Sequence, residues 1–386
     1  MGTNLSVLDL KHTLKELKQK SGSHSPSIKF LKRELPQVEI KIDACFLSNP
    51  YATELFMDYF NSEIVNKGKL RDLLEFYPSQ NNNIAEALGG FFKINPGSIF
   101  IGNGAIEIIQ AIIHNYTKNS IVINIPTFSS YHDFVKPGVD IHFFKLLKEE
   151  KFELDIDRYI DFVKKIKPDT VVIINPNNPD GGYLPVKDVY KIVSQLDFVK
   201  NIIIDESFIH FAFEDESLQI TSSYELVKEY KNVIIIKSLS KDFGIAGVRA
   251  GYAIMDEKRV TELLKHGFLW NSNGIAEYFF DLYCRPDFAA EYNNVRIQYI
   301  KDTQDFLKET RSLKGFISYP SYANFALLEI ENKESDFDVF VKLLVDYGVY
   351  VRPCKDKIGL DGEYIRVSSR KRDENEYVLN ALKSLY

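Results

Sequence analysis

The 386-residue sequence predicts an α/β fold with a large, mostly parallel central sheet and a smaller α+β C-terminal part. Short runs rich in isoleucine and valine recur along the middle of the chain without polar alternation. Such runs are typical of strands buried on both faces of a helix-covered parallel sheet. The segments between them have helix-like patterns, and repeated strand–helix–strand order indicates an α/β domain. The runs are 120–123, 170–174, 201–204 and 233–236.

The two ends of the chain have different patterns. Leu10, Leu14 and Leu17 predict an amphipathic helix over 7–18, and a polar stretch at 21–27 ends it. After about residue 273, a charged and aromatic helical stretch (291–308) precedes short strand-like pieces and further helices. The strand-like pieces are 325–328, 349–351 and 364–367. We therefore expect an N-terminal arm at 1–47 that packs with the small domain or a partner subunit, a large domain at 48–273 and a small domain at 274–386.

Composition narrows the class of protein. The formal net charge of −6 gives no reason to expect a nucleic acid or a membrane surface as partner. Three widely separated cysteines, with no cluster of His and Cys, indicate neither a disulfide scaffold nor a metal site. No apolar run approaches the roughly 20 residues that span a bilayer. The N-terminus lacks the pattern of a secretory signal. We expect a cytoplasmic protein.

Polar and glycine-rich pieces stand where predicted strands end. They are NPNNPDG (175–181), DESF (205–208), SLSKDFGIAGVRAGY (238–252) and, before a helix, GNG (102–104). Open α/β sheets bind ligands outside the carboxyl ends of their strands, so we expect these pieces to form one site. Each alone has a plainer interpretation: Lys241 as a solvated lysine, Asp205 as a helix N-cap, and NPNNPDG as a turn. Only the ordered set is specific.

In this order and at these separations, the pieces resemble the fold-type I pyridoxal-phosphate (PLP) enzymes of the class I and II aminotransferase group. The resemblance covers nearly the whole chain and implies an aspartate-aminotransferase-like fold whose large domain binds PLP. Within the group, the histidinol-phosphate aminotransferase and L-threonine-O-3-phosphate decarboxylase branches fit best. The resemblance also implies a homodimer with shared active sites.

The resemblance implies roles for the residues around the cofactor. Lys241 would carry PLP covalently and then act as general base and acid. Asp205 would pair with the protonated pyridine nitrogen, and Asn178 would donate a hydrogen bond to the phenolic oxygen of the ring. The phosphate would be held by Ser238, Ser240, Arg249 and the backbone amides of Gly104, Ala105 and Ile106 at a helix N-terminus.

Two aromatic residues are also expected near the cofactor. Phe128 would stack on the pyridine ring, although such a residue is more often part of a core. Tyr77 would reach the phosphate in the partner subunit's site, with a local packing role as the alternative.

The substrate residues are expected toward the two ends of the chain. Arg366 would bind the substrate carboxylate, Arg352 an anionic distal group, and Asn324 would lie near the substrate. For both arginines a structural ion pair is the alternative. His24 falls where the decarboxylase branch has a histidine in its N-terminal arm, with a surface histidine as the alternative.

Two positions bear on the reaction. Aminotransferases of this group usually have a tyrosine where this chain has Phe208, whereas the threonine-phosphate decarboxylase branch has phenylalanine. The segment 359–367 also resembles the C-terminal signature of that branch. Asp180 replaces the usual threonine of its motif, and its charge could lie at the rim of the turn. Gly247 and Gly251 are expected to permit close backbone packing where the chain re-enters the sheet.

The leading hypothesis is decarboxylation of O-phosphothreonine or O-phosphoserine to a phosphorylated amino alcohol. The alternative is an aminotransferase that uses glutamate and a phosphorylated carbonyl compound. The two reactions differ in which bond to Cα stands perpendicular to the cofactor ring, and the sequence does not reveal that torsion. A third hypothesis, a non-catalytic descendant that binds PLP or a protein, is disfavoured by Lys241, Asp205, Asn178 and Arg249.

Overall fold

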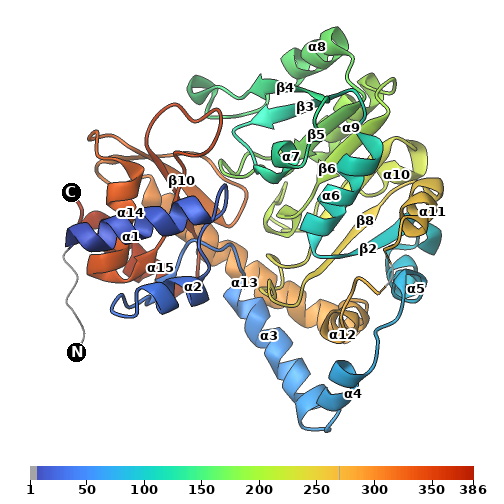
Figure 1. The fold of residues 1–386 in the computed structure, drawn as a ribbon, viewed down its shortest axis with the longest axis horizontal. Helices are drawn as coiled ribbons and strands as arrows, with labels where there is room; N and C mark the ends of the chain where they lie inside the picture. The colour runs from blue at the N-terminus through green and yellow to red at the C-terminus, as the bar shows by residue number, and fades with distance from the viewer. Residues whose placement is uncertain (1–6, 269) are drawn as a thin grey trace. The chain divides into compact units, whose positions relative to one another are not determined.

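The computed structural model describes residues 7–268 and 270–386 and divides into two compact units (Figure 1). The large unit comprises Ser48–Lys301 and Tyr322–Asn324. The small unit comprises the chain up to Leu47, Asp302–Ser321 and Phe325–Tyr386. The domain boundaries predicted from the sequence at 47/48 and 273/274 remain a prediction, and residues 274–301 lie in the large unit.

The large unit is built on a seven-stranded sheet of order β2-β8-β7-β6-β5-β3-β4. The strands β7, β6, β5, β3 and β4 pair in parallel, whereas β8 pairs antiparallel with both β2 and β7. This confirms the predicted α/β fold with a mostly parallel sheet. The strands are β2 (Ile99–Asn103), β3 (Ser120–Ile125), β4 (Asp140–Lys145), β5 (Thr170–Ile174), β6 (Asn201–Asp205), β7 (Val233–Ser238) and β8 (Ala250–Ile254).

Helices precede, connect and follow the strands of this sheet. The helices are α3 (Pro50–Phe60), α4 (Leu70–Glu75), α5 (Asn81–Phe92), α6 (Ala105–Tyr116), α7 (Ser130–Asp133), α8 (Ile156–Ile166), α9 (Val186–Gln195), α10 (Leu226–Glu229), α11 (Glu257–Lys265), α12 (Gly274–Tyr283) and α13 (Pro286–Thr310), which continues past Lys301 into the small unit. Short helical turns occur at Asn61–Val65, Pro96–Ser98, Lys148–Glu150 and Ile209–Phe211. No helix among the described residues is both long enough and apolar enough to cross a bilayer.

One face of the sheet packs on α6, which lies over the strands in Figure 1. Ile108 and Ile112 of α6 share an apolar core with Ile203 of β6 and with Ile234 and Ile236 of β7. Side chains alternate between the two faces of a strand. The last residues of β6 and β7, which are the predicted site residues Asp205 and Ser238, therefore point to the same face as this core.

The small unit has its own core. A four-stranded antiparallel sheet, β12-β13-β10-β9, is accompanied by a parallel pair, β1 with β11. Leu14 and Leu31 of the N-terminal segment are buried in the same core as Leu344 and Val367 of the C-terminal part. The elements are α1 (Val7–Lys20), α2 (Ile28–Glu34), β1 (Ile42–Asp43), β9 (Phe316–Ser318), β10 (Phe325–Ile330), α14 (Asp336–Tyr347), β11 (Val349–Tyr350), β12 (Arg352–Pro353), β13 (Tyr364–Ser368) and α15 (Arg372–Lys383).

Candidate active site

The predicted strand-end pieces meet at one edge of the large sheet. The parallel strands β5, β6 and β7 end there, and β2 runs in the same direction because both β2 and β7 are antiparallel to β8. Asn175, Asp205, Ser238 and Gly104 therefore lie at or just beyond the same edge. This is the place where open α/β sheets bind ligands.

The glycine turn before α6 forms a cradle with Arg249. Gly104 has a φ of 76°, and α6 begins at Ala105 without a side-chain cap. The Nη2 group of Arg249 donates to the carbonyl of Asn103 at 3.2 Å. The positive φ favours glycine at this position, and a Cβ atom there would also lie 2.2 Å from that Nη2 atom. The uncapped helix start and the guanidinium place positive charge together, which fits the phosphate of PLP.

The loop after β7 holds the predicted lysine and serines. Ser238 and Ser240 are buried, and the backbone N–H of Ser240 donates to Ser238 Oγ at 3.3 Å. Lys241 is half-buried, and its carbonyl accepts hydrogen bonds from the backbone N–H groups of Asn49 at 3.0 Å and Gly244 at 3.2 Å. The loop therefore fixes the backbone of Lys241 at the sheet edge.

The two glycines after this loop differ from each other. A Cβ on Gly251 would lie 2.8 Å from the backbone nitrogen of Ala105, so the glycine permits β8 to approach α6 closely, which fits the close backbone packing predicted for it. The same expectation for Gly247 is wrong, because a Cβ there meets open space.

Asp205 is held by a tyrosine that the sequence patterns did not identify. The hydroxyl of Tyr131, in α7, donates to Asp205 Oδ2 at 2.8 Å, and the N–H of Ser207 donates to Oδ1 at 2.8 Å. Burial raises the pKa of Asp205, and the hydrogen bonds from Ser207 and Tyr131 oppose that shift. The carboxylate is therefore oriented by two donors, and a cationic partner would favour its ionised form further.

The loop after β5 is tied to the loop after β3. Asn177 Nδ2 donates to the carbonyl of Pro126 at 3.0 Å, and Thr127 Oγ1 donates to Asn177 Oδ1 at 3.2 Å. The adjacent Asn178 is buried, and Phe128 is half-buried against the core that includes α6. These bonds link the segments that carry Asn178 and Phe128.

Asp180 is not at the rim of its turn, which corrects the sequence interpretation. Its side chain is 1% exposed and accepts hydrogen bonds from the backbone N–H of Gly182 at 2.7 Å and from Asn177 Nδ2. Burial raises the pKa of Asp180 to about 7, while both donors favour the carboxylate. The turn is therefore built around an acceptor that receives two hydrogen bonds.

Replacing Asp180 with asparagine should destabilise the protein at pH 8, where the aspartate is ionised. The amide NH₂ group would face either the N–H of Gly182 or the NH₂ of Asn177, which leaves buried donors unpaired. We expect the free energy of unfolding to fall by about 1–3 kcal/mol. Urea denaturation would show this as a lower midpoint at unchanged slope. Asp157→Asn, at an exposed position, is the control, and equal midpoints for the two variants would contradict the expectation.

Three further predicted residues occupy different environments in the large unit. Phe208 is buried, and it brings no hydroxyl to the site. Asn324 is fully buried, and its Nδ2 donates to Tyr299 Oη at 3.1 Å. Tyr77 is 85% exposed, with its ring centroid 5.5 Å from that of Trp270. The side chain of Tyr77 is therefore largely accessible to a second molecule.

The small unit contains a group of cationic side chains, the cation cluster, in which Lys18 is partly buried and Arg352, Lys357 and Arg366 are buried. Arg352 faces Arg366 across β12 and β13, and both are almost fully buried. Arg352 pairs with Asp356 at 2.7 Å, and Lys18 pairs with the same carboxylate at 3.0 Å. Arg366 donates to the carbonyl of Cys45 at 2.9 Å. The structural alternative for Arg352, an ion pair, is therefore present.

Lys357 was not identified from the sequence, where it is one lysine in a charged stretch. It is 6% exposed, and burial lowers its pKa to about 8, with the nearby charge of Arg352 adding to the shift. His24 lies at the surface of the same unit, and its carbonyl accepts a hydrogen bond from Lys18 at 3.0 Å. Burial disfavours the charged forms of these side chains, and a negative charge nearby would favour them. The cluster is therefore suited to an anionic ligand.

The chain is similar to decarboxylases and to a histidinol-phosphate aminotransferase. The chain is 52% identical over 373 residues to an L-serine phosphate decarboxylase of Campylobacter jejuni, covering 97% of this chain and 96% of that protein. The structure of a decarboxylase from Sulfurospirillum multivorans is similar with a TM-score of 0.94 and 46% identity, covering 99% of both chains. A histidinol-phosphate aminotransferase of Methanococcus aeolicus is 33% identical, covering 80% of this chain and 82% of that protein. Residues 61–382 match the model of the family aminotransferase class I and II. The chain belongs to this family.

Proposed function

We propose that the chain is a PLP-dependent decarboxylase that converts O-phosphoserine to phosphoethanolamine and carbon dioxide. The observation that carries the proposal is the 52% identity, over 97% of the chain, to an L-serine phosphate decarboxylase. The cradle at Gly104 and Arg249 and the cation cluster support a phosphorylated cofactor and a phosphorylated substrate. In the reaction the bond from Cα to the carboxylate breaks, carbon dioxide leaves, and a proton is added to Cα.

The large unit would hold the cofactor. When bound, PLP supplies a ring that accepts the electron pair left behind as the carboxylate departs. Lys241 would carry the cofactor and, once released by the substrate amine, deliver the proton to Cα. Asp205, oriented by Tyr131, would keep a proton on the pyridine nitrogen, and Asn178 would donate to the phenolic oxygen.

The other cofactor contacts are proposed from the resemblance to the class I and II aminotransferase group. Phe128 would stack on the ring, and Phe208 would pack beside it. The phosphate would be bound by Ser238, Ser240, Arg249 and the amides of Gly104, Ala105 and Ile106 at the start of α6.

The cation cluster would bind the substrate's anionic groups. Arg366 would take the carboxylate by paired hydrogen bonds, and Arg352 and Lys357 would take the phosphate. Arg352 would then exchange part of its contact with Asp356 for the substrate. Asn324 and His24 are proposed as further substrate contacts.

Phe208 favours decarboxylation over the aminotransferase alternative. The buried phenyl ring supplies no hydroxyl where aminotransferases of this group usually have one. Loss of that donor should change the basicity of the nitrogen that joins lysine and cofactor. An aminotransferase acting on a phosphorylated carbonyl compound remains the second candidate, supported by the identity of 33% to a histidinol-phosphate aminotransferase.

We also propose a homodimer located in the cytoplasm. Several large apolar side chains around α4 are exposed, and an interface between copies would cover them. They are Leu70, Leu74, Phe76, Tyr77 and Trp270. Tyr77 would then reach the cofactor phosphate of the partner subunit. The three free cysteines agree with a reducing compartment.

Product analysis tests the proposed reaction. The purified enzyme with PLP is incubated with O-phosphoserine or O-phosphothreonine, each with and without an α-keto acid. We expect carbon dioxide release from O-phosphoserine that does not need the keto acid. Absence of carbon dioxide with both compounds, together with glutamate-dependent amination of a phosphorylated ketone, would assign the aminotransferase instead.

A further inference from the structure

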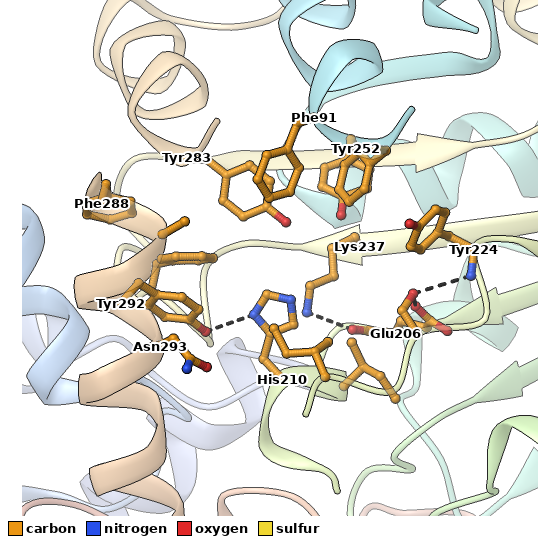
Figure 2. A pocket seen from close by; sticks show the side chains of 16 residues that line it. Phe91, Glu206, His210, Tyr224, Lys237, Tyr252, Tyr283, Phe288, Tyr292 and Asn293 are labelled. Atoms are coloured by element: carbon orange, nitrogen blue, oxygen red, sulfur yellow. Dashed lines mark hydrogen bonds between the residues drawn. The ribbon is translucent and has the colours of Figure 1, made fainter. Parts of the chain in front are cut away.

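A second group of buried charges lies behind the site, on the other face of the large sheet. Lys237 precedes Ser238 on β7, so its side chain points away from α6 and from the cofactor residues. It lines a cavity of about 390 Å³ together with Glu206, His210 and a ring of aromatic side chains. Figure 2 shows Lys237 directed toward Glu206 and His210, with Tyr292 on the far side of His210. None of the proposed cofactor contacts uses these residues.

The charges in this group are almost completely buried and paired. Lys237 is 2% exposed and Asp242 is 0% exposed, and the two side chains form an ion pair. Lys237 Nζ also donates to the carbonyl of Glu206 at 2.9 Å. His210 Nδ1 lies 3.4 Å from Asp242 Oδ2 and 2.8 Å from Tyr292 Oη. Burial lowers the pKa of His210 well below its usual value, with Lys237 and Arg296 contributing, so the imidazole is neutral.

This group is connected to Lys241 through the backbone, because Asp242 is the next residue. The ring of Phe243, one residue further, stacks on Tyr292 with centroids 4.0 Å apart. The carbonyl of Lys241 also accepts hydrogen bonds from the N–H groups of Asn49 and Gly244. The main chain around Lys241 is therefore held by these two hydrogen bonds and by the buried contacts of the next two residues, Asp242 and Phe243.

Loss of one charge would disturb this arrangement. A buried carboxylate without its cation costs several kcal/mol, so Asp242 would either take up a proton or move toward water. Movement of Asp242 would shift the neighbouring backbone of Lys241. A misplacement of about 1 Å at a reacting group can reduce a rate by about 100-fold.

We propose that Lys237 and Asp242 are positioning residues for Lys241, and that they set its backbone from the face of the sheet opposite the cofactor. The pair touches neither cofactor nor substrate. The inference rests on the proposed function only through Lys241 as the residue that carries PLP. It assigns a role to the lysine four residues before Lys241, which the sequence motif does not explain.

Three variants and their combination separate positioning from stability. In Lys237→Met, Asp242 loses its cation, and in Asp242→Asn, Lys237 loses its anion. The double variant Lys237→Met/Asp242→Asn has neither charge, and replacing a buried ion pair by neutral groups is often neutral for stability. Lys237→Arg keeps the charge. The exposed pair of Lys191 and Asp157, 2.6 Å apart, provides the control in Lys191→Met/Asp157→Asn.

Two measurements are made on each variant: urea unfolding of the protein without PLP, and the rate at which added PLP becomes trapped on Lys241 by borohydride, read by peptide mass spectrometry. We expect Lys237→Met to lose stability and to incorporate PLP at Lys241 about 10–100-fold more slowly. The double variant should regain stability but stay slow, and Lys237→Arg should be close to wild type. With O-phosphoserine, kcat should fall while KM changes little.

The results distinguish a pair that positions Lys241 from a pair that only stabilises the fold. Recovery of the trapping rate together with stability in the double variant would show a purely structural pair, and unchanged trapping in every variant would also overturn the proposal. If a single variant does not fold, the double variant supplies the measurement. Because trapping on Lys241 needs no substrate, it tests the pair even if the enzyme proves not to be a decarboxylase.

Discussion

Replacing Lys241 with alanine should lower kcat for carbon dioxide release from O-phosphoserine by at least about 10³-fold, because the variant loses both the covalent attachment and the proton donor. The residues around the proposed phosphate position remain, so the variant should still bind PLP. We expect the bound cofactor to be removed by dialysis, whereas the wild-type protein treated with borohydride should retain it on the peptide that contains Lys241. Mass spectrometry of both proteins checks the site of attachment.

Lys191→Ala provides the control for a lysine of the large unit outside the site. Its side chain is about half exposed and pairs with Asp157, and an exposed ion pair contributes about 0–1 kcal/mol. This variant should keep wild-type activity and labelling. If Lys241→Ala released carbon dioxide at the wild-type rate, or carried reduced PLP on another lysine such as Lys237, the assignment of Lys241 would fail.

The strands and the residues at their ends were predictable because each depends on local sequence. Runs such as 170–174 and 233–236 are apolar enough to indicate buried strands, and parallel pairing then brings Asp205 and Ser238 to one edge. The edge strand β4 and the strand β8 were not identified. β4 is only partly buried, and β8 contains two alanines and a glycine, so neither has a strong apolar pattern.

Residues whose roles depend on the tertiary fold have no comparable pattern in the sequence. Tyr131 meets Asp205 from 74 positions away, and Lys357 looks like one more lysine until the fold buries it. The sequence pattern around Asp180 predicts a charge at the rim of a turn, because turn sequences are usually solvated. The donors from Asn177 and Gly182 explain how its carboxylate can be buried instead. For Tyr131 the missing information is the identity of a distant neighbour, whereas for Lys357 and Asp180 it is the burial that the fold imposes.

Replacing Lys357 with methionine should raise KM for O-phosphoserine by about 10–100-fold and change kcat much less, because a hydrogen bond to a charged group contributes about 1.5–3 kcal/mol. The variant should fold. Burial lowers the pKa of Lys357, so its ionisation opposes folding at neutral pH, and methionine removes that cost. Steady-state kinetics on both proteins, with urea unfolding in parallel, measures the effect.

The pH dependence gives the sharper test of Lys357. Its pKa in the free protein is about 8, and only the protonated amine attracts a phosphate dianion, so the attraction is lost as pH rises through 8. For the wild-type enzyme kcat/KM should fall by about threefold to tenfold between pH 7 and pH 9, since this ratio reports groups of the free enzyme. Lys357→Arg keeps its charge and should retain activity at pH 9, and Lys357→Met should lack this limb of the profile.

Lys355→Met is the matched control, two residues earlier in the same turn. Lys355 is mostly exposed and pairs with Glu363, outside the cation cluster. Its loss should leave KM and the pH profile unchanged, because the side chain is directed to solvent. If Lys357→Met and Lys355→Met had the same KM, or if Lys357→Arg kept the wild-type fall above pH 8, the phosphate would have to be bound by Arg352 without help from Lys357. The descending limb would then belong to another group of the enzyme or the substrate.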